Sequence, residues 1–113
     1  MTTKELEDLQ MRENKKVCQE IKDSGDIVEL PRNIVHKLEF ISEYKRRDLV
    51  EELEENGFII NDNFVTEEGY NGFTFARDDS VANDSIDALT LFLIELADEH
   101  DAKYQGWTTS IVT

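Results

Sequence analysis

The order of two hydrophobic periods along the chain constrains its fold more than any other feature. Residues 34–41 alternate between two sets of side chains, one of them mainly apolar, as expected for a strand with one buried face. A helical period follows over residues 43–56, with Ser42 as its capping residue and Asn56-Gly57 as its stop signal. The chain therefore enters its core as a strand followed by a helix.

Two further strands, a helix and a last strand follow. Residues 58–65 and 73–77 are typical strand segments joined by a glycine-containing turn, which predicts an antiparallel hairpin. Apolar residues at helical spacing predict a helix over 84–100, and residues 102–112 are rich in strand-forming types. The whole order predicts an α+β fold of the ferredoxin-like (split β-α-β) class, a four-stranded antiparallel sheet with two helices on one face. The first and third strands should be central.

A further helix is expected ahead of this core, over residues 3–23. Its apolar stripe is thin, and Ser24-Gly25 provides a stop signal before a connector that contains Pro31. The stripe consists of Leu6, Leu9, Val17 and Ile21. A length of 113 residues suits one domain, so we interpret 1–113 as a single domain, with the N-terminal helix in 1–25 and the ferredoxin-like core in 34–113.

The charge of the chain indicates which partners it favours. Acidic residues number 26 and basic residues 12, giving a net charge of −14 at pH 7. Residues 58–113 alone hold 11 acidic and two basic residues. Such a field repels nucleic acid and anionic lipid, so we expect no direct nucleic-acid or membrane binding and a basic protein segment as partner. The first residues lack an apolar signal segment, which predicts a cytoplasmic protein.

Motifs for catalysis, cofactors or structural metals are missing from the sequence, which contains no Gly-x-Ser-x-Gly, no phosphate-binding glycine loop and no His-Glu-x-x-His. Cys18 is the one cysteine, and neighbouring lysines are expected to lower its pKa. The acidic 78–87 loop offers oxygen ligands, but helix capping explains it better than an ion. We therefore expect no enzyme, no cofactor and no metal; a metal-dependent enzyme on this scaffold is the third-ranked hypothesis.

Two apolar residues of the 84–100 helix are expected to point away from the sheet and to pack against another helix or a partner. With Leu89 at 0° and 100° per residue, Leu91 falls near 200° and Ile94 near 140°, outside the stripe that faces the core. Either the N-terminal helix covers them, or a partner does. A second copy of the chain is one such partner, so a homodimer is among the alternatives.

An aromatic pair in the last strand is the other candidate binding feature. Regular alternation places Tyr104 and Trp107 on opposite faces of the sheet, whereas a bulge at Gly106 places them on the same face. The residues leave both arrangements open. The aromatics either belong to the core or form a partner-binding anchor on the open face.

The same segment carries a family resemblance. Tyr104-Gln105-Gly106-Trp107-Thr108-Thr109 resembles the Tyr-Asp-Gly-Trp-Gly-Thr run of the regulator of ribonuclease E activity B family, with Gln105 in place of aspartate and Thr108 in place of the second glycine. Ile34, His36 and Leu38 look like the family's Ile-x-His-x-Leu first strand. Asn56-Gly57-Phe58 is similar to the glycine-aromatic pair that begins the family's second strand. The resemblance covers most of the chain.

The resemblance implies an intracellular bacterial protein with a ferredoxin-like domain behind an N-terminal helix. It also implies inhibition of ribonuclease E through binding to the scaffold region of that enzyme, without cutting RNA. Together with the charge, this predicts a non-catalytic, acidic protein-binding regulator. The residues leave one alternative open, an acidic binding or immunity-type module that neutralises a different basic protein.

Overall fold

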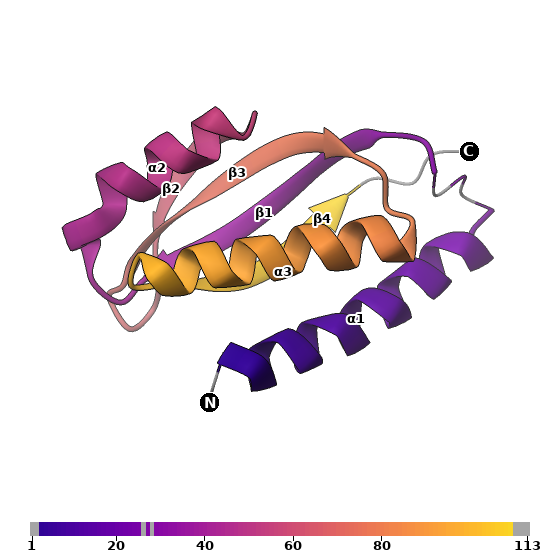
Figure 1. Cartoon of the computed structure of the whole chain (residues 1–113), viewed down its shortest axis with the longest axis horizontal. Coiled ribbons are helices and arrows are strands. Elements are labelled where there is room, and N and C mark those ends of the chain that lie inside the picture. The colour runs from indigo at the N-terminus through magenta and orange to yellow at the C-terminus, as the bar shows by residue number, and fades with distance from the viewer. Residues whose placement is uncertain (1–2, 26, 28, 110–113) are drawn as a thin grey trace.

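The structure is a computed structural model, and it describes residues 3–25, 27 and 29–109. Over these residues the chain forms three α-helices, one short 3-10 helix and four strands (Figure 1). In chain order the elements are α1 (Thr3–Asp23), β1 (Arg32–Phe40), the 3-10 helix η1 (Glu43–Lys45), α2 (Arg46–Glu55), β2 (Ile59–Val65), β3 (Asn71–Asp79), α3 (Asn83–Glu99) and β4 (Ala102–Thr109).

The four strands form one antiparallel sheet in the order β2-β3-β1-β4. The prediction that the first and third strands are central is confirmed. Ile34 lies opposite Arg77, and Leu38 lies opposite Phe73. The second strand of the predicted hairpin therefore pairs with the first strand of the core, which leaves β2 and β4 at the edges.

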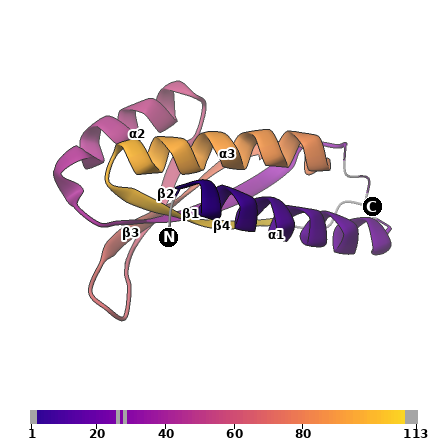
Figure 2. The same ribbon diagram turned by 60° about the horizontal axis from the view of Figure 1, so that its bottom comes forward.

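Helices α2 and α3 cover one face of this sheet, and α1 runs alongside α3 (Figures 1 and 2). Alternate side chains of β1 point toward the helices and are at most 2% exposed; they are Ile34, His36, Leu38 and Phe40. Phe73 and Phe75 of β3 extend this core and are fully buried. The β2–β3 hairpin bends away from the helical layer (Figure 2).

The first helix has the predicted bounds, but its buried side is shifted from the predicted stripe, of which Ile21 is buried and Leu6 and Val17 are half-buried. Leu9 of the predicted stripe is 46% exposed, whereas Asn14 and Cys18 are buried together with Ile21. The reason is that α1 packs mainly on α3 and reaches the sheet through Asn14, which is hydrogen-bonded to Trp107 of β4, so the side that it buries includes polar and small residues.

The ends of the other elements differ slightly from the prediction. Ser42 precedes a 3-10 turn before α2 begins, and its hydroxyl oxygen accepts a hydrogen bond from the Tyr44 amide. The third helix begins at Asn83 after the N-cap Ala82, whose side chain makes no capping hydrogen bond. Residues 110–112 of the predicted last strand lie outside the described residues.

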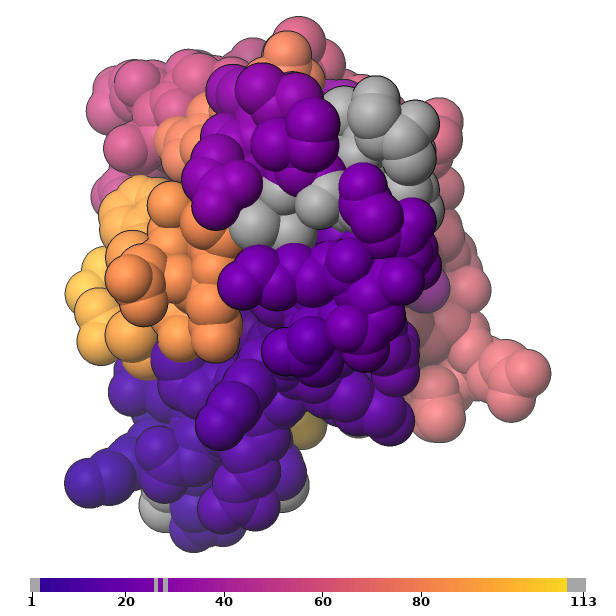
Figure 3. All heavy atoms as spheres, turned by 90° about the vertical axis from the view of Figure 1, so that its right-hand side faces the viewer, coloured from indigo at the N-terminus to yellow at the C-terminus, as the bar shows by residue number. Residues whose placement is uncertain are grey.

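The connector between α1 and β1 is held by Arg32, which is 5% exposed. Its guanidinium group donates hydrogen bonds to the backbone carbonyls of Ile27 (2.8 Å) and Leu30 (3.1 Å). The first strand begins two residues before its predicted start, because Arg32 and Asn33 pair with Asp79 and Asp78 of β3. Figure 3 shows the end of α1 and this connector beside the start of α3, with the β2–β3 hairpin projecting on the other side.

Candidate functional site

A bulge in β4 decides where its two aromatic side chains lie. Trp107 lies opposite His36 and Gly106 opposite Lys37, but the next pair is Tyr104 with Leu38, so one residue of β4 is additional. Gly106 has a φ of +112°, which L side chains rarely adopt. The bulged alternative is therefore the one that the chain uses.

Both aromatic residues consequently face the helical layer. Trp107 and Tyr104 are partly buried and pack against the core. The hypothesis of an aromatic anchor on the open face of the sheet is wrong in this respect, because the bulge turns Trp107 toward α1. Its partner-binding role stays a prediction.

Asn14 of α1 connects Trp107 to both helices. It is fully buried, and its side-chain oxygen accepts hydrogen bonds from the Trp107 indole N–H (2.8 Å) and from the Gln10 side-chain amide (2.8 Å). Its amide group donates to the Thr90 hydroxyl (2.8 Å) and to an Asp87 carboxylate oxygen (3.0 Å). The polar capacity of a buried amide is thereby used fully.

Tyr104 forms a second buried link, to β1. Its hydroxyl group and Nδ1 of His36 are 2.7 Å apart. Burial, and secondarily the charge of Arg77, lowers the pKa of His36 to about 3, so the ring is neutral at pH 7. Burial also raises the pKa of Tyr104 well above its usual value. His36 is thus a buried, hydrogen-bonded ring, and the pair joins the two strands that carry the family-like motifs.

The helix α1 covers the second predicted binding feature. Ile94 is 5% exposed and lies beside residues of α1, and Leu91 is half-buried. At helical spacing Leu91 shares a side of α3 with Asp87 and Ile94. The expectation that both residues are covered holds for Ile94 and in part for Leu91, and no second subunit is needed to explain it.

A cleft of about 420 Å³ opens next to these residues, between α1 and the start of β4. Its apolar lining comes from four elements or their ends: Leu6, Leu9, Ile41, Ile94, Ala102 and Tyr104. Its polar lining is Thr3, Gln10, Glu13, Asp98 and Lys103. The structure thus brings Ile94 and Tyr104 together at one cleft, whereas Trp107 and Gly106 lie farther along β4.

Carboxylates are concentrated on the helices. The sequence of α3 contains five acidic and no basic residues, and that of α2 contains five acidic residues and two arginines. Where α1 meets α3, the carboxyl groups of Glu7 and Glu95 lie near each other. Partial burial and the charge of Glu95 raise the pKa of Glu7, and Lys4 offsets this only in part.

The other candidate side chains have structural roles. Asp79 accepts hydrogen bonds from Arg77, and Asp87 accepts one from Asn14. Among the described residues, no group of three or more His, Cys, Asp or Glu side chains is placed to hold a metal ion. The thiol of Cys18 is buried and contacts the Val81 carbonyl, and burial raises its pKa. The expected lowering of this pKa by nearby lysines is wrong, because burial and the charge of Asp87 outweigh the opposite effect of Lys22.

Sequence reasoning missed Asn14 and the Glu7–Glu95 pair. An asparagine in the middle of a helix is a weak signal that its side chain has a tertiary partner. The carboxylate pair has no signal along the chain, since it forms only when α1 and α3 pack together.

The comparison with protein families accords with this arrangement. The family model described as Regulator of ribonuclease activity B (RraB) matches residues 11–109. The chain belongs to the RraB family. The match includes Asn14, the His36–Tyr104 pair and the bulge at Gly106, so the family region contains the contacts that fix α1 and β4. No curated protein matches the chain. Within the described part of this RraB-family chain, no helix is long and apolar enough to cross a membrane.

Proposed function

We propose that this protein is a non-catalytic regulator that inhibits a ribonuclease by docking on a basic segment of it. The observation that carries the proposal is the RraB family match over residues 11–109, combined with the acidic sequence of α3. We assign the core to the ferredoxin-like class on its strand order, treat 1–113 as one domain, and place the protein in the bacterial cytoplasm.

The scaffold region of ribonuclease E is the partner that we favour. A basic segment of that region would complement helix α3, which carries five acidic residues and no basic residue and contributes Ile94 and Asp98 to the cleft beside α1. The same charge opposes RNA binding, because phosphates are repelled from a chain of net charge −14. Inhibition would then arise from altered assembly or access of the nuclease, without contact to its RNA.

The test uses the purified protein with ribonuclease E from the same organism, in full-length form and as the catalytic region without its scaffold. We expect slower RNA cleavage by the full-length enzyme and no effect on the catalytic region. The association rate should fall at least about tenfold between ~0.05 and ~0.5 M salt, because screening removes steering between opposite charges. RNA cleavage by the protein alone, or association that salt does not change, would contradict the proposal.

A further inference from the structure

The cleft between α1 and the start of β4 has apolar walls that remain open to solvent. Leu9 of α1 is 46% exposed, and Ile41, which follows β1, is 60% exposed. Both line the cleft, and Ile94, which is 5% exposed, lines it from α3. Exposed large apolar residues on separate elements of one cleft form a pocket for an apolar side chain of a partner.

The same cleft is surrounded by carboxylates. Glu13 and Asp98 belong to its lining, where Lys103 is the one basic residue among those described. Glu7 directly follows Leu6, and Glu95 directly follows Ile94, so this pair of neighbouring carboxyl groups lies beside two lining residues. Two neighbouring carboxylates favour the approach of a cation, which would relieve their mutual repulsion.

We propose that this cleft binds a basic segment of a partner protein, in which one apolar side chain is flanked by arginine or lysine. The apolar side chain enters between Leu9 and Ile41, and the flanking cations meet the Glu7–Glu95 pair and Asp98. This inference rests on the proposed function and names the site where docking occurs. The β4 strand at this cleft is an edge strand, which leaves one side of its backbone unpaired with other strands.

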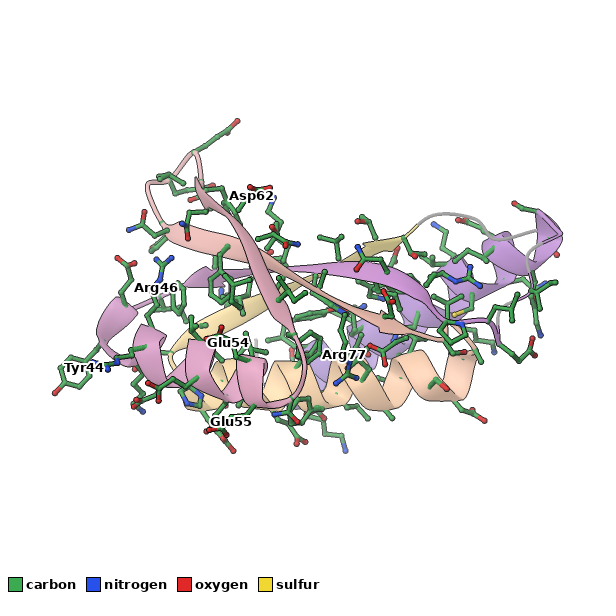
Figure 4. The ribbon with its side chains drawn as sticks, turned by 90° about the horizontal axis from the view of Figure 1, so that it is seen from above. Tyr44, Arg46, Glu54, Glu55, Asp62 and Arg77 are labelled. Carbon is green, nitrogen blue, oxygen red and sulfur yellow. The ribbon has the colours of Figure 1, made fainter. Side chains whose placement is uncertain are left out.

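Two other surfaces fit such a partner less well. Tyr44 of η1 is 92% exposed and points away from the body, and Glu54 and Glu55 lie near the end of the adjoining α2 (Figure 4). Tyr44 lines a shallow depression in which the other apolar residue is Val50, and Val50 is half-buried. Among the described residues, this depression therefore lacks a second wall of large exposed apolar side chains opposite Tyr44.

The open face of the sheet is the other alternative. The register places Lys37 and Lys103 on this face together with Glu39 and Asp78. Its charges are balanced, so it offers a basic segment little attraction.

The experiment uses a capped, labelled Arg-Arg-Leu-Arg-Arg peptide as probe, and fluorescence anisotropy at about 50 mM salt, where the Debye length exceeds 10 Å. The double variant Glu7→Gln/Glu95→Gln should raise Kd at least fivefold. The matched control Glu54→Gln/Glu55→Gln removes the same charge from α2 and should change Kd less than twofold. Leu9→Ser should weaken binding similarly, whereas Ile59→Ser on the open sheet face should not.

The same variants are then tested against ribonuclease E. One outcome separates the two proposals. If the wild-type protein inhibits the enzyme, but the cleft variants and the control variants lower the affinity for the peptide and for the enzyme by equal amounts, the cleft is not the binding site and the proposed function stands. If the wild-type protein neither binds nor inhibits the enzyme, the proposed function fails, whatever the peptide shows. A peptide in which alanine replaces leucine should bind less tightly; equal binding would overturn the apolar pocket.

Discussion

The indole N–H of Trp107 donates a 2.8 Å hydrogen bond to the side-chain oxygen of Asn14, 93 residues earlier in the chain. The same amide reaches Thr90 and Asp87 on α3, so one buried residue joins the N-terminal helix to the last helix and the last strand. Docking of α1 therefore depends on a polar network as well as on apolar burial, and the cleft beside it depends on that docking.

The first prediction concerns this network. Replacing Asn14 by aspartate removes the N–H groups that reach Thr90 and Asp87 and places a second carboxylate beside Asp87. We expect the free energy of unfolding at pH 7 to fall by about 2–3 kcal/mol, because buried hydrogen bonds are lost and a charge is left unpaired. Trp107 is the one tryptophan, so its emission should shift to longer wavelength as α1 loosens.

The exposed Asn61 provides the control for this substitution. Asn61→Asp makes the same chemical change outside the network and should leave both the melting temperature and the emission nearly unchanged. An Asn14→Asp protein that matches it in both measurements would show that the network does not hold α1.

The second prediction is a dependence of stability on pH that His36 causes. The pKa of His36 is lowered to about 3 in the folded protein, from a usual value of 6.5. The unfolded chain therefore binds a proton that the folded protein does not, and stability should decline between pH 6.5 and pH 3 by about 1.4 kcal/mol for each pH unit. His36→Phe should flatten this decline, measured by denaturant unfolding across the range.

Tyr104→Phe separates the titration from the hydrogen bond. It keeps His36 but removes the hydroxyl partner of Nδ1, which should lower stability at pH 7 by about 1–3 kcal/mol. The decline toward low pH should persist in this variant. If it disappears, or if His36→Phe retains the full decline, a different group is responsible.

The third prediction is a dependence of stability on pH that Glu7 causes, and its sign is opposite to that of the His36 effect. The pKa of Glu7 is raised in the folded protein, by partial burial and by Glu95. A carboxyl group with a raised pKa favours the folded state below that pKa and opposes it above. Glu7→Gln should therefore raise the melting temperature at pH 7, and this gain should vanish once acid protonates Glu7 in the wild-type protein. Glu55→Gln, exposed on α2, is the control, and a gain that is independent of pH would contradict the assignment.

The strand order was predictable because hydrophobic periods fix the type and order of elements, and few sheets accommodate that order. The residues of α1 show where this reasoning ends. Its bounds follow from the stop at Ser24-Gly25, but its buried side includes Asn14, whose polar side chain is buried only because Trp107, Thr90 and Asp87 lie around it. Partners that are distant in sequence leave no periodic trace.

The site was predictable in its residues but not in its geometry. Tyr104, Trp107 and Ile94 stood out by type and spacing, yet the cleft beside them requires the packing of α1 against α3. The face occupied by Trp107 depended on a single residue in β4, and alternation alone does not reveal a bulge, because one additional residue reverses every later side chain.

The last prediction tests that bulge. The φ of +112° at Gly106 is a conformation that costs other residues about 1–2 kcal/mol, and no atom within 4 Å would contact an added Cβ. Gly106→Ala should therefore destabilise the protein by about that amount through the backbone alone.

Deleting Gln105 removes the additional residue. Tyr104 then stays opposite Leu38, Gly106 opposite Lys37 and Trp107 opposite His36, in a regular strand whose aromatics still face the helices. In the shortened chain, position 106 no longer needs a positive φ, so Gly106→Ala should cost much less than in the full-length chain. The measurement is a double-mutant cycle of unfolding free energies, with Trp107 emission confirming that the aromatic face is kept. Additive costs would show that the positive φ at Gly106 does not originate from the bulge.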